Sequence, residues 1–412
     1  MSLSKQPRTG NQALVREINL AAIMNNLRKH APISRADLAD LTGLNKTTVS
    51  SLIQELSDLQ FVREVGLNVS AGTGRPGILL ELNPNAGYMI SAEIGVDFIA
   101  VMCANFAVES VWQHKETTTP KMGHQAIIDR ALTLLHRAAN AGGKAYPALL
   151  GVVVGVPGLV DQRDGAVLFA PNLGWQNIPL RAQLEQSFGP RVFVNNEANL
   201  AVLGEYYFGA AQGSHEVLYV SAGVGLGGGI IHDGQLCNGS TGFAGEFGHM
   251  TMDAEGEVCN CGNRGCWETQ ASQSALFRYI RQAITEEKCA SLLTGATLSN
   301  LDELTVPLVV EAARAGDAVA QEALNRVGCY LGIGIASLVN ALNPELVVFG
   351  GILSLASDFL LPVIHAQLEQ RALRWNENAV KVTLSQHQLN SCMMGGLATI
   401  YQSVLTKPTK II

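Results

Sequence analysis

The second half of the chain holds three cysteines and a histidine with the types and spacing of a metal site. Cys259, Cys261 and Cys266 lie within eight residues, and His249 precedes the first of them by ten. One imidazole and three thiolates suit a tetrahedral Zn²⁺ ion, and the glycines between the cysteines allow the loop to fold around it. Four protein ligands leave no position for water, so we predict a structural zinc. Free thiols in a turn are the alternative.

Polar side chains that suit a sugar flank this cluster. The stretch Gly245-Glu246-Phe247-Gly248-His249 and the later Glu268 place two carboxylates and an imidazole on one loop, where they can hydrogen-bond vicinal hydroxyls. If one nitrogen of His249 binds zinc, the other stays free for a hydroxyl. Two more stretches bring amides and a carboxylate to loop or strand-to-helix positions: Pro171-Asn172 and Asn195-Asn196-Glu197-Ala198-Asn199.

Each of these sugar-type groups also has an ordinary structural interpretation. A lone Glu or Asn in a loop is commonly a helix cap or a solvated group. Glu197 in particular could cap the helix that follows it.

The first 84 residues have the pattern of a helix-turn-helix. Helices are expected over Glu17–His30, from Ser34 and from Asn45, with Thr42-Gly43 as the turn between the last two. The third helix has a buried stripe at i, i+3, i+4 and i+7, formed by Val49, Leu52, Ile53 and Leu56. Opposite this stripe lie small polar side chains that can approach DNA bases, with a lysine in the first turn that can meet a phosphate: Thr47, Ser50, Ser51, Gln54 and Lys46.

A hairpin follows these helices and resembles a wing. Phe61–Val65 and Ile78–Leu82 are strand candidates, and Gly72–Pro76 between them offers Arg75 to DNA at the tip. The tail Lys5–Arg16 is either a minor-groove arm or a solvated tail. The alternative for the whole head is a three-helix bundle with a hairpin, or a helix-turn-helix that binds protein.

The rest of the chain reads as an α/β body. Three strand-like runs come first, and strands then alternate with helices, including a helix over Glu197–Phe208 and a long one over Ala318–Leu342. Strands are also expected at Val217–Ser221 and Gly229–His232, on either side of a glycine-rich turn.

Length, composition and charge agree with a DNA-binding head on an acidic body. The 412 residues are 47% hydrophobic, enough for two or three packed domains. Residues 1–84 hold nine Lys/Arg against seven Asp/Glu, whereas the remainder holds nineteen against twenty-eight. No unbroken apolar run reaches the length of a membrane span, and the N-terminus lacks the apolar segment of a signal peptide. We therefore expect a cytoplasmic protein without a membrane partner.

These motifs together resemble those of the ROK family of repressors and sugar kinases, over essentially the whole chain. The motifs on which the resemblance rests are Gly245-Glu246-x-Gly248-His249, the Cys-x-Cys-Gly-x-x-Gly-Cys run ending in Trp267-Glu268-Thr269, Val156-Pro157-Gly158, and Asn343-Pro344 with Gly350-Gly351. The resemblance implies a winged helix-turn-helix followed by a two-lobed, actin-like (ribonuclease H-like) body with sugar in the cleft. It implies zinc on His249, Cys259, Cys261 and Cys266, and sugar contacts on Asn172, Asn196, Glu197, Glu246, His249 and Glu268.

The expected domains follow from this resemblance. The head is 1–84, the first lobe 85–195 with about 389–412, and the second lobe 196–388 with the zinc loop. Within the family, three stretches are most similar to repressors of xylose operons: the run 42–51, Gly74-Arg75-Pro76 and Asn196-Glu197-Ala198-Asn199.

The resemblance also indicates that kinase chemistry has been lost. Family kinases hold ATP phosphates with an Asp-x-Gly-Gly-Thr turn, and the matching stretch here is Glu93-Ile94-Gly95-Val96-Asp97. Val96 is bulky where backbone must approach phosphate, and Asp97 adds a negative charge. The kinases' catalytic Asp corresponds to Glu197, which is one methylene longer. We therefore expect no enzyme activity.

The sequence thus predicts a sugar-responsive repressor of a carbohydrate-utilisation operon. Sugar in the cleft closes the lobes of a dimer or tetramer, and operator DNA is released. Xylose is the first candidate inducer, with glucose, N-acetylglucosamine and oligosaccharides left open. A sugar kinase with a DNA-binding head is the alternative, and control by a protein partner is a third possibility.

Overall fold

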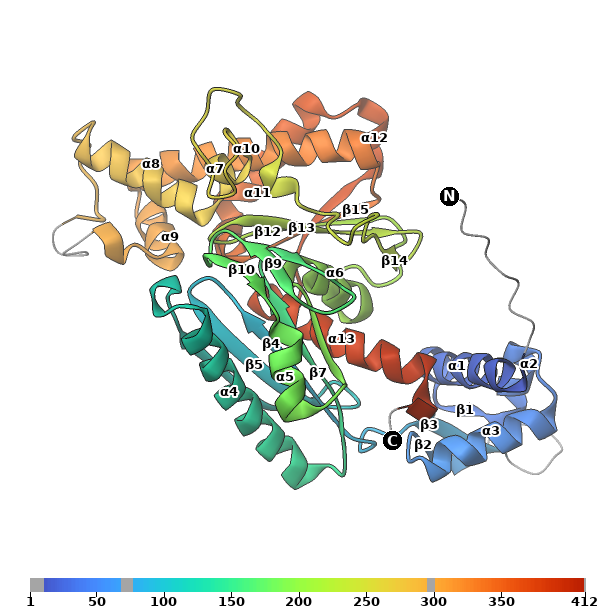
Figure 1. Ribbon diagram of the computed structural model, residues 1–412. Helices are drawn as coiled ribbons and strands as arrows, with labels where there is room; N and C mark the ends of the chain where they lie inside the picture. The colour runs from blue at the N-terminus through green and yellow to red at the C-terminus, as the bar shows by residue number, and fades with distance from the viewer. Residues whose placement is uncertain (1–10, 68–76, 295–300, 411–412) are drawn as a thin grey trace, which may run out of the picture.

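The structure is a computed structural model that describes residues 11–67, 77–294 and 301–410. A small N-terminal head is attached to a larger body that contains two five-stranded sheets (Figure 1). The expected wing tip, Gly72–Pro76 with Arg75, and residues 5–10 of the expected arm lie outside the described residues.

The head combines three helices with a three-stranded sheet. Its elements are α1 (Gln12–His30), β1 (Ile33–Ser34), α2 (Arg35–Thr42), α3 (Lys46–Asp58), β2 (Val62–Leu67) and β3 (Ile78–Leu82). Strand β3 pairs antiparallel with β1 and with β2, which gives the two strands of the expected hairpin.

Local capping explains where the helices of the helix-turn-helix begin. The Ser34 hydroxyl accepts from the Asp37 N–H at 3.3 Å, and Asn45 Oδ1 accepts from the Thr48 N–H at 2.8 Å. Each such cap stabilises its helix by about 1 kcal/mol. Gly43 adopts a left-handed φ of 70° between α2 and α3, a conformation that glycine reaches without steric cost.

The N-terminal boundary of the head differs from the expectation. Helix α1 begins at Gln12, because Asn11 accepts a hydrogen bond from the Ala13 N–H and caps it. Arg16 lies inside this helix and pairs with Glu55 of α3 at 2.6 Å. The interpretation of Arg16 as part of an extended minor-groove arm is therefore wrong.

The first sheet of the body has the order β11-β7-β4-β5-β6. Its strands are β4 (Tyr88–Ile94), β5 (Phe98–Asn105), β6 (Ser110–Thr117), β7 (Leu149–Val156) and β11 (Val192–Asn196). Ile90 and Ala92 of β4 face the cluster built with α4 (His124–Ala145), whereas Met89 faces the cluster that includes α13 (Ser391–Thr406). Alternation along the strands thus places α4 and α13 on opposite faces of this sheet.

The second sheet has the order β14-β13-β12-β15-β16. Its strands are β12 (Val217–Ala222), β13 (Leu226–His232), β14 (Gln235–Leu236), β15 (Leu346–Gly350) and β16 (Lys381–Leu384). Helix α6 (Glu197–Phe208) covers one face. The other face packs against a helical layer of α7 (Glu268–Ala271), α8 (Gln273–Thr285), α9 (Val306–Arg314), α10 (Ala318–Leu342) and α11 (Ser357–Arg371), with α12 (Arg374–Ala379) beside it.

Several elements were not anticipated from the sequence. A three-stranded sheet follows β7 in the chain and precedes α5 (Leu180–Phe188), with strands β8 (Leu159–Val160), β9 (Val167–Ala170) and β10 (Trp175–Ile178). Six short 3₁₀ turns are η1 (Pro120–Met122), η2 (Phe247–His249), η3 (Leu301–Glu303), η4 (Ile352–Ala356), η5 (Gln388–Asn390) and η6 (Pro408–Lys410).

Strand β13 starts earlier than expected, inside the glycine run. Gly227, Gly228 and Gly229 are strand residues paired with β12, not part of a turn. A Cβ on Gly228 would lie 2.3 Å from the Phe247 ring, and one on Gly229 would lie 2.8 Å from the Ala198 carbonyl oxygen. These glycines therefore let η2 and α6 approach the strand closely.

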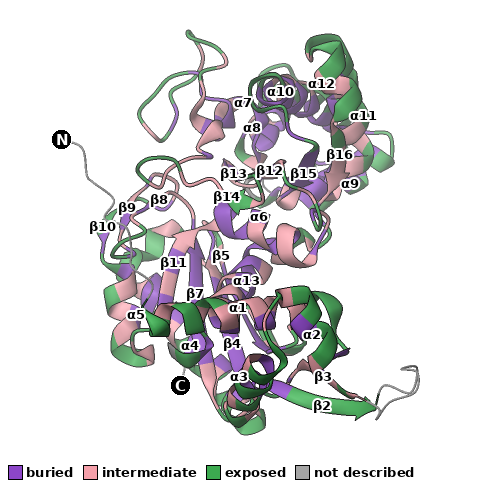
Figure 2. Ribbon diagram, turned by 90° about the vertical axis from the view of Figure 1, so that its right-hand side faces the viewer, coloured by how far each residue is buried: buried purple, intermediate pink, exposed green. Residues whose placement is uncertain are grey.

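The head packs directly on the body. Figures 1 and 2 both place α1 beside the C-terminal end of α13. Phe106 lies between Phe61 of the head and Tyr401 of α13, with ring-centroid distances of 5.7 and 5.0 Å. The core residues of the head, such as Leu27, belong to the same hydrophobic cluster as α13, so the two parts share one core.

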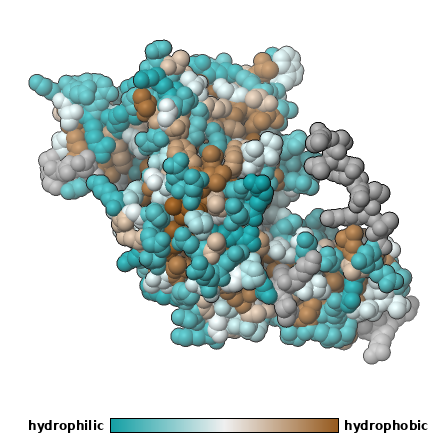
Figure 3. All heavy atoms as spheres, in the orientation of Figure 1, coloured by the Kyte–Doolittle hydropathy of each residue, from teal (hydrophilic) through white to brown (hydrophobic). Residues whose placement is uncertain are grey.

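One helical stretch, Ile352–Arg371, is long and apolar enough to cross a membrane by length and composition alone, with a mean hydropathy of 1.2. Its residues Leu360, Ile364 and Leu368 are buried in the cluster that contains α10. On the face shown in Figure 3, hydrophobic residues gather in a band across the middle of the body, and hydrophilic residues dominate the periphery. The buried face of this stretch is what a core helix of a globular domain shows.

A buried carboxylate ties α6 to the segment that precedes α13. Glu205 is fully buried and accepts hydrogen bonds from the Ser385 hydroxyl at 2.6 Å and from the N–H groups of Ala210, Gln386 and His387 at 2.8 to 3.1 Å. Burial alone would raise the pKa of Glu205, but these donated hydrogen bonds together lower it below its usual value.

We predict that Glu205→Gln lowers the free energy of unfolding at pH 7 by about 2 kcal/mol or more, because the new amide N–H₂ faces backbone donors. Urea unfolding measures the change. The pKa of Glu205 is lower in the folded than in the unfolded chain. The contribution of this carboxylate to the free energy of unfolding is therefore fully present above about pH 4.3, the usual pKa of Glu, and is lost as the pH falls through the folded-state pKa. The difference from wild type should therefore shrink in acid. Glu185→Gln, at a partly exposed pair with Arg181, is the control and should cost under about 0.5 kcal/mol; equal costs would contradict the account.

Candidate functional site

A cavity of about 330 Å³ lies between the two five-stranded sheets. Its walls come from the ends of β4, β7 and β11 on one side, from the β12–β13 turn, η2 and α7 on the other, and from the start of α13. All six residues that the sequence proposed as sugar contacts line this one cavity: Asn172, Asn196, Glu197, Glu246, His249 and Glu268.

Asn196 and Glu197 have different roles at the end of β11. Asn196 Oδ1 accepts from the N–H groups of Ala198 and Asn199 and caps α6, while its Nδ2 donates to the Gly158 carbonyl at 3.1 Å. Glu197 is the first residue of α6, and its buried Oε2 has no hydrogen-bond partner among the described residues. The capping role considered for Glu197 thus belongs to Asn196, and the Glu197 carboxylate is available to a ligand.

Three glutamates that line this cavity, Glu197, Glu93 and Glu246, have raised pKa values. Burial, and then the neighbouring Glu246, Glu93 and Glu268, raise the pKa of Glu197 well above its usual value. Burial likewise raises the pKa of Glu93 to about 7 and also raises the pKa of Glu246. Protonated carboxyl groups can donate as well as accept hydrogen bonds, which suits a neutral polyhydroxyl ligand.

Glu268 links the two walls of the cavity. Its Oε2 accepts from the Leu226 N–H at 2.9 Å, and its Oε1 accepts from Asn172 Nδ2 at 3.3 Å. Asn172 Oδ1 in turn accepts from Asn260 Nδ2 at 2.8 Å. Gly225 permits this arrangement, because a Cβ there would lie 2.4 Å from Glu268 Oε2.

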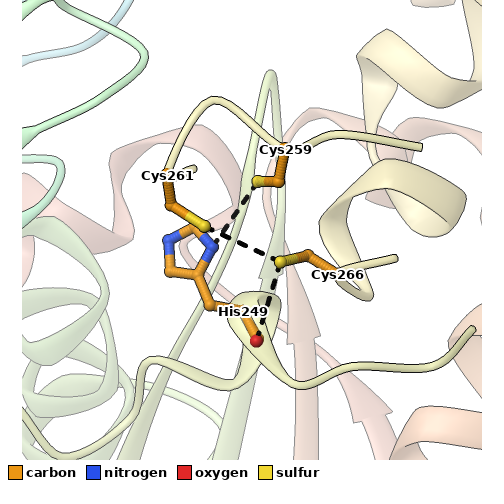
Figure 4. Close-up of side chains that lie close together, drawn as sticks. All are labelled: His249, Cys259, Cys261 and Cys266. Carbon is orange, nitrogen blue, oxygen red and sulfur yellow. Dashed lines mark hydrogen bonds between the residues drawn. The ribbon is translucent and has the colours of Figure 1, made fainter. Parts of the chain in front are cut away.

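The four residues proposed as metal ligands come together beside the cavity. Figure 4 shows the imidazole and the three sulfur atoms converging, and all four ligand atoms lie within 4.8 Å of one another. Cys261 Sγ is 3.7 Å from Cys266 Sγ, and Cys259 Sγ is 3.8 Å from His249 Nδ1. Tetrahedral zinc with bonds of about 2.3 Å separates its sulfur ligands by about 3.8 Å, so the donor set and spacing fit Zn²⁺.

Without a cation, the buried thiols of the cluster are protonated. Burial raises the pKa of Cys259 to about 12 and raises that of Cys266, so the thiols keep their protons until a metal displaces them. His249 Nδ1 faces the sulfurs, and its Nε2 lies 3.9 Å from Glu246 Oε2 on the cavity side. The second ring nitrogen is thus positioned toward the cavity.

The stretch compared with a phosphate turn forms the hairpin between β4 and β5. The Gly95 N–H donates to the Phe98 carbonyl at 2.9 Å, and Val96 and Asp97 line the outer part of the cavity. Lys115 Nζ lies 4.0 Å from the centroid of the Phe98 ring.

Some cavity residues were missed by the sequence analysis. Glu93 was considered only as part of the phosphate turn, and Tyr219, Ser221, Lys115 and Cys392 were not considered. Ser221 and Glu93 are each the last residue but one of a strand, β12 and β4, and this position near a strand end is the local signal that could have found them.

The proposed DNA-contacting residues lie on one exposed face of α3. Lys46, Thr47, Ser50, Ser51 and Gln54 are all exposed, whereas the four apolar residues of the stripe are buried. Gln54 Nε2 donates to Asp58 Oδ1 at 2.8 Å on the same face. Arg75, the sixth proposed contact, lies outside the described residues.

Known proteins similar to this chain include both regulators and kinases. The xylose repressor of Caldicellulosiruptor bescii is 34% identical over 401 residues, which cover 97% of this chain and 99% of the relative. A ROK family transcriptional regulator described as a homologue of the E. coli MLC protein has a TM-score of 0.82 at 26% identity, with 95% of this chain and 97% of that chain covered.

A ROK family glucokinase from Streptomyces griseus, solved with glucose and AMPPNP, has a TM-score of 0.68 at 33% identity and covers 76% of this chain and 99% of its own. These neighbours confirm the predicted fold class of a winged head on a two-lobed body. Residues 16–63 match winged helix-turn-helix DNA-binding domains, and residues 89–403 match the ROK family. This chain therefore belongs to the ROK family and carries an N-terminal winged helix-turn-helix.

Proposed function

We propose that this chain is a transcriptional repressor of carbohydrate-utilisation genes and that a small sugar in the cavity releases it from operator DNA. The observation that carries the proposal is that one chain joins an exposed α3 face to a cavity lined by carboxylates, amides and an imidazole. The full-length similarity to a xylose repressor makes xylose the first candidate inducer. The protein is proposed to act in the cytoplasm as a dimer or tetramer.

The proposal divides the chain by role. Residues 1–84 bind DNA, 85–195 with about 389–412 form the first lobe, and 196–388 form the second lobe with the metal loop. Lys46 would meet a phosphate, and the hydroxyl and amide groups of α3 would face the bases. Arg75, expected at the wing tip, is proposed to contact the DNA backbone.

In the cavity, the sugar is proposed to bind through its hydroxyl groups. The Oε2 atom of Glu197 is buried and has no partner among the described residues, so a sugar hydroxyl there would satisfy it. Glu246 and the Nε2 of His249 lie side by side at 3.9 Å, a spacing that suits two neighbouring hydroxyls. Asn172, Asn196 and Glu268 complete the proposed set.

Zinc is the proposed metal of the cysteine cluster. His249, Cys259, Cys261 and Cys266 would hold it, and the ion would supply structural cross-linking of the loop rather than chemistry. The loop carries His249 and precedes Glu268, so its shape controls the position of proposed sugar contacts.

Two helices are proposed to carry the sugar signal to the head. Helix α6 begins at Glu197 in the cavity and ends near Tyr207, and α13 begins near Cys392 in the cavity and reaches Tyr401. At the far ends of both helices, the Arg28 guanidinium of α1 lies 5.7 Å from the centroid of the Tyr207 ring. Arg28 Nε is buried there without a hydrogen-bond partner in the described chain. Because Arg28 belongs to α1 and contacts Tyr207 of α6, a change in the position of α6 would act directly on α1.

A sugar kinase with a DNA-binding head is the second candidate, favoured by the 33% identity to the glucokinase. Against it we propose that Glu93, Val96, Asp97 and Glu197 are poor substitutes for the phosphate-binding and catalytic residues of a kinase. Sugar-dependent consumption of ATP by the purified protein would favour the kinase.

We predict that Glu197→Ala abolishes release of operator DNA by sugar and leaves operator affinity unchanged, because Glu197 lies in the cavity and far from α3. Calorimetry with D-xylose measures sugar binding, and a gel-shift titration measures DNA binding. Glu185→Ala, at a partly exposed site on α5, is the control. Unchanged sugar affinity in the Glu197 variant would show that the cavity assignment is wrong.

We predict one zinc ion per chain in the purified protein, and loss of metal together with the sugar response in Cys261→Ser. The physical reason is that three ligands bind zinc more weakly than four and leave the loop unanchored. Elemental analysis measures the metal, with Cys289→Ser, an exposed cysteine outside the cluster, as the control. Stoichiometric zinc in Cys261→Ser would contradict the ligand set.

A further inference from the structure

One side chain of the metal loop donates a hydrogen bond to the opposite wall of the cavity. Asn260 stands between Cys259 and Cys261, and its Nδ2 donates to Asn172 Oδ1 at 2.8 Å. Asn172 belongs to the turn that joins β9 and β10, on the side of the first sheet. The two residues are 88 positions apart in the chain, so this bond joins separate parts of the fold.

This contact and the Glu268 carboxylate together hold the Asn172 amide in one orientation. Because Asn172 Oδ1 already accepts from Asn260, its Nδ2 is turned to Glu268 and donates to Oε1 at 3.3 Å. Glu268 Oε2 then accepts from the Leu226 N–H at 2.9 Å. The result is a connected series of hydrogen bonds from the metal loop, across the cavity wall, to the second sheet, in which the Glu268 carboxylate accepts from both sides.

The backbone around Asn260 depends on the cluster. The Gly262 N–H donates to the Cys259 carbonyl at 2.9 Å and closes a tight turn that contains Asn260. Asn260 itself is exposed, so little packing holds it in place. Its position therefore depends on its two cysteine neighbours, which a bound metal ion would fix.

We infer that Asn260 is a positioning residue that couples the metal loop to sugar binding by orienting the Asn172 amide. This inference rests on the proposed function of the cavity. Asn260 does not line the cavity, so it acts through Asn172 and not by contact with the sugar.

A second amide pair supplies a matched comparison. Gln162 Nε2, between β8 and β9, donates to Asn238 Oδ1, after β14, at 2.6 Å. This bond also joins parts of the chain that are far apart in sequence, but neither residue lines the cavity, and the bond includes neither the cysteine cluster nor Asn172. It therefore separates a general bridging effect from the orientation of Asn172.

The test compares Asn260→Asp with Gln162→Glu in the full-length protein, because each change replaces the donor amide of its pair by a carboxylate. The aspartate at 260 has no side-chain N–H to donate, so Asn172 Oδ1 loses its partner and the new carboxylate competes with Glu268 for Asn172 Nδ2. D-xylose affinity by calorimetry should fall about tenfold in Asn260→Asp, the size of one hydrogen bond. Zinc content and operator affinity should stay at wild-type values, and Gln162→Glu should change xylose affinity less than twofold.

A double-mutant cycle separates positioning from a merely structural role. In an Asn172→Ala background, Asn260→Ala should change xylose affinity less than twofold, whereas in the wild-type background it should cost about tenfold. Equal losses in both backgrounds, or equal losses in Gln162→Glu and Asn260→Asp, would overturn the inference.

Hydrogen exchange tests the coupling without any sugar. The amides of the turn that carries Asn172 should exchange faster in Asn260→Asp and in chelator-treated wild type than in the zinc-loaded protein. Unchanged exchange in both would overturn the inference. A wild type that binds neither xylose, glucose nor N-acetylglucosamine would contradict the proposed function, and the exchange result would then decide the positioning role alone.

Discussion

The close packing of α6 against α13 is the contact on which the rest of the molecule depends. A Cβ on Gly395 of α13 would lie 1.6 Å from the Leu200 carbonyl oxygen of α6, and one on Gly204 of α6 would lie 2.5 Å from the Ser391 carbonyl oxygen. Only glycine allows backbones to approach so closely. The Glu205 carboxylate locks the same pair from the side, through the segment that precedes α13. The two helices can therefore respond to a force only as a unit.

That pair has the cavity at one end and the head at the other. Over its 16 residues α13 spans about 24 Å, from Cys392 in the cavity wall to the core shared with α1. At the far end, the Tyr207 hydroxyl donates to Gln402 Oε1 at 2.5 Å, and the ring centroids of Phe208 and Tyr401 are 5.8 Å apart. The helices therefore stay joined where the head contacts them. A ligand that prefers one arrangement of the cavity must then favour one position of the head, which is the requirement for allosteric release of DNA.

Features carried by short-range spacing could be predicted from the sequence, and features carried by long-range contact could not. The buried stripe of α3 and the cysteine cluster each depend on residues spaced a few positions apart in the chain. Both are found where that spacing predicted them. The glycines of β13 look like a turn in the sequence. The structure requires them for a different reason, the close approach of Phe247 and Ala198, and these residues lie elsewhere in the chain. The bond from Asn260 to Asn172 spans 88 positions and has no local signal at all. Arg16 was misplaced because its partner Glu55 is on another helix.

The most direct test of the central claim uses the reciprocity of linked binding. D-xylose is titrated by calorimetry into the protein alone and into the protein saturated with a duplex that it has itself selected from a random pool. If the cavity and the head are linked through α6 and α13, the DNA-bound protein binds xylose at least five times more weakly, by the same factor that xylose weakens DNA binding. Equal xylose affinity in the two states would show that the cavity and the head are not coupled.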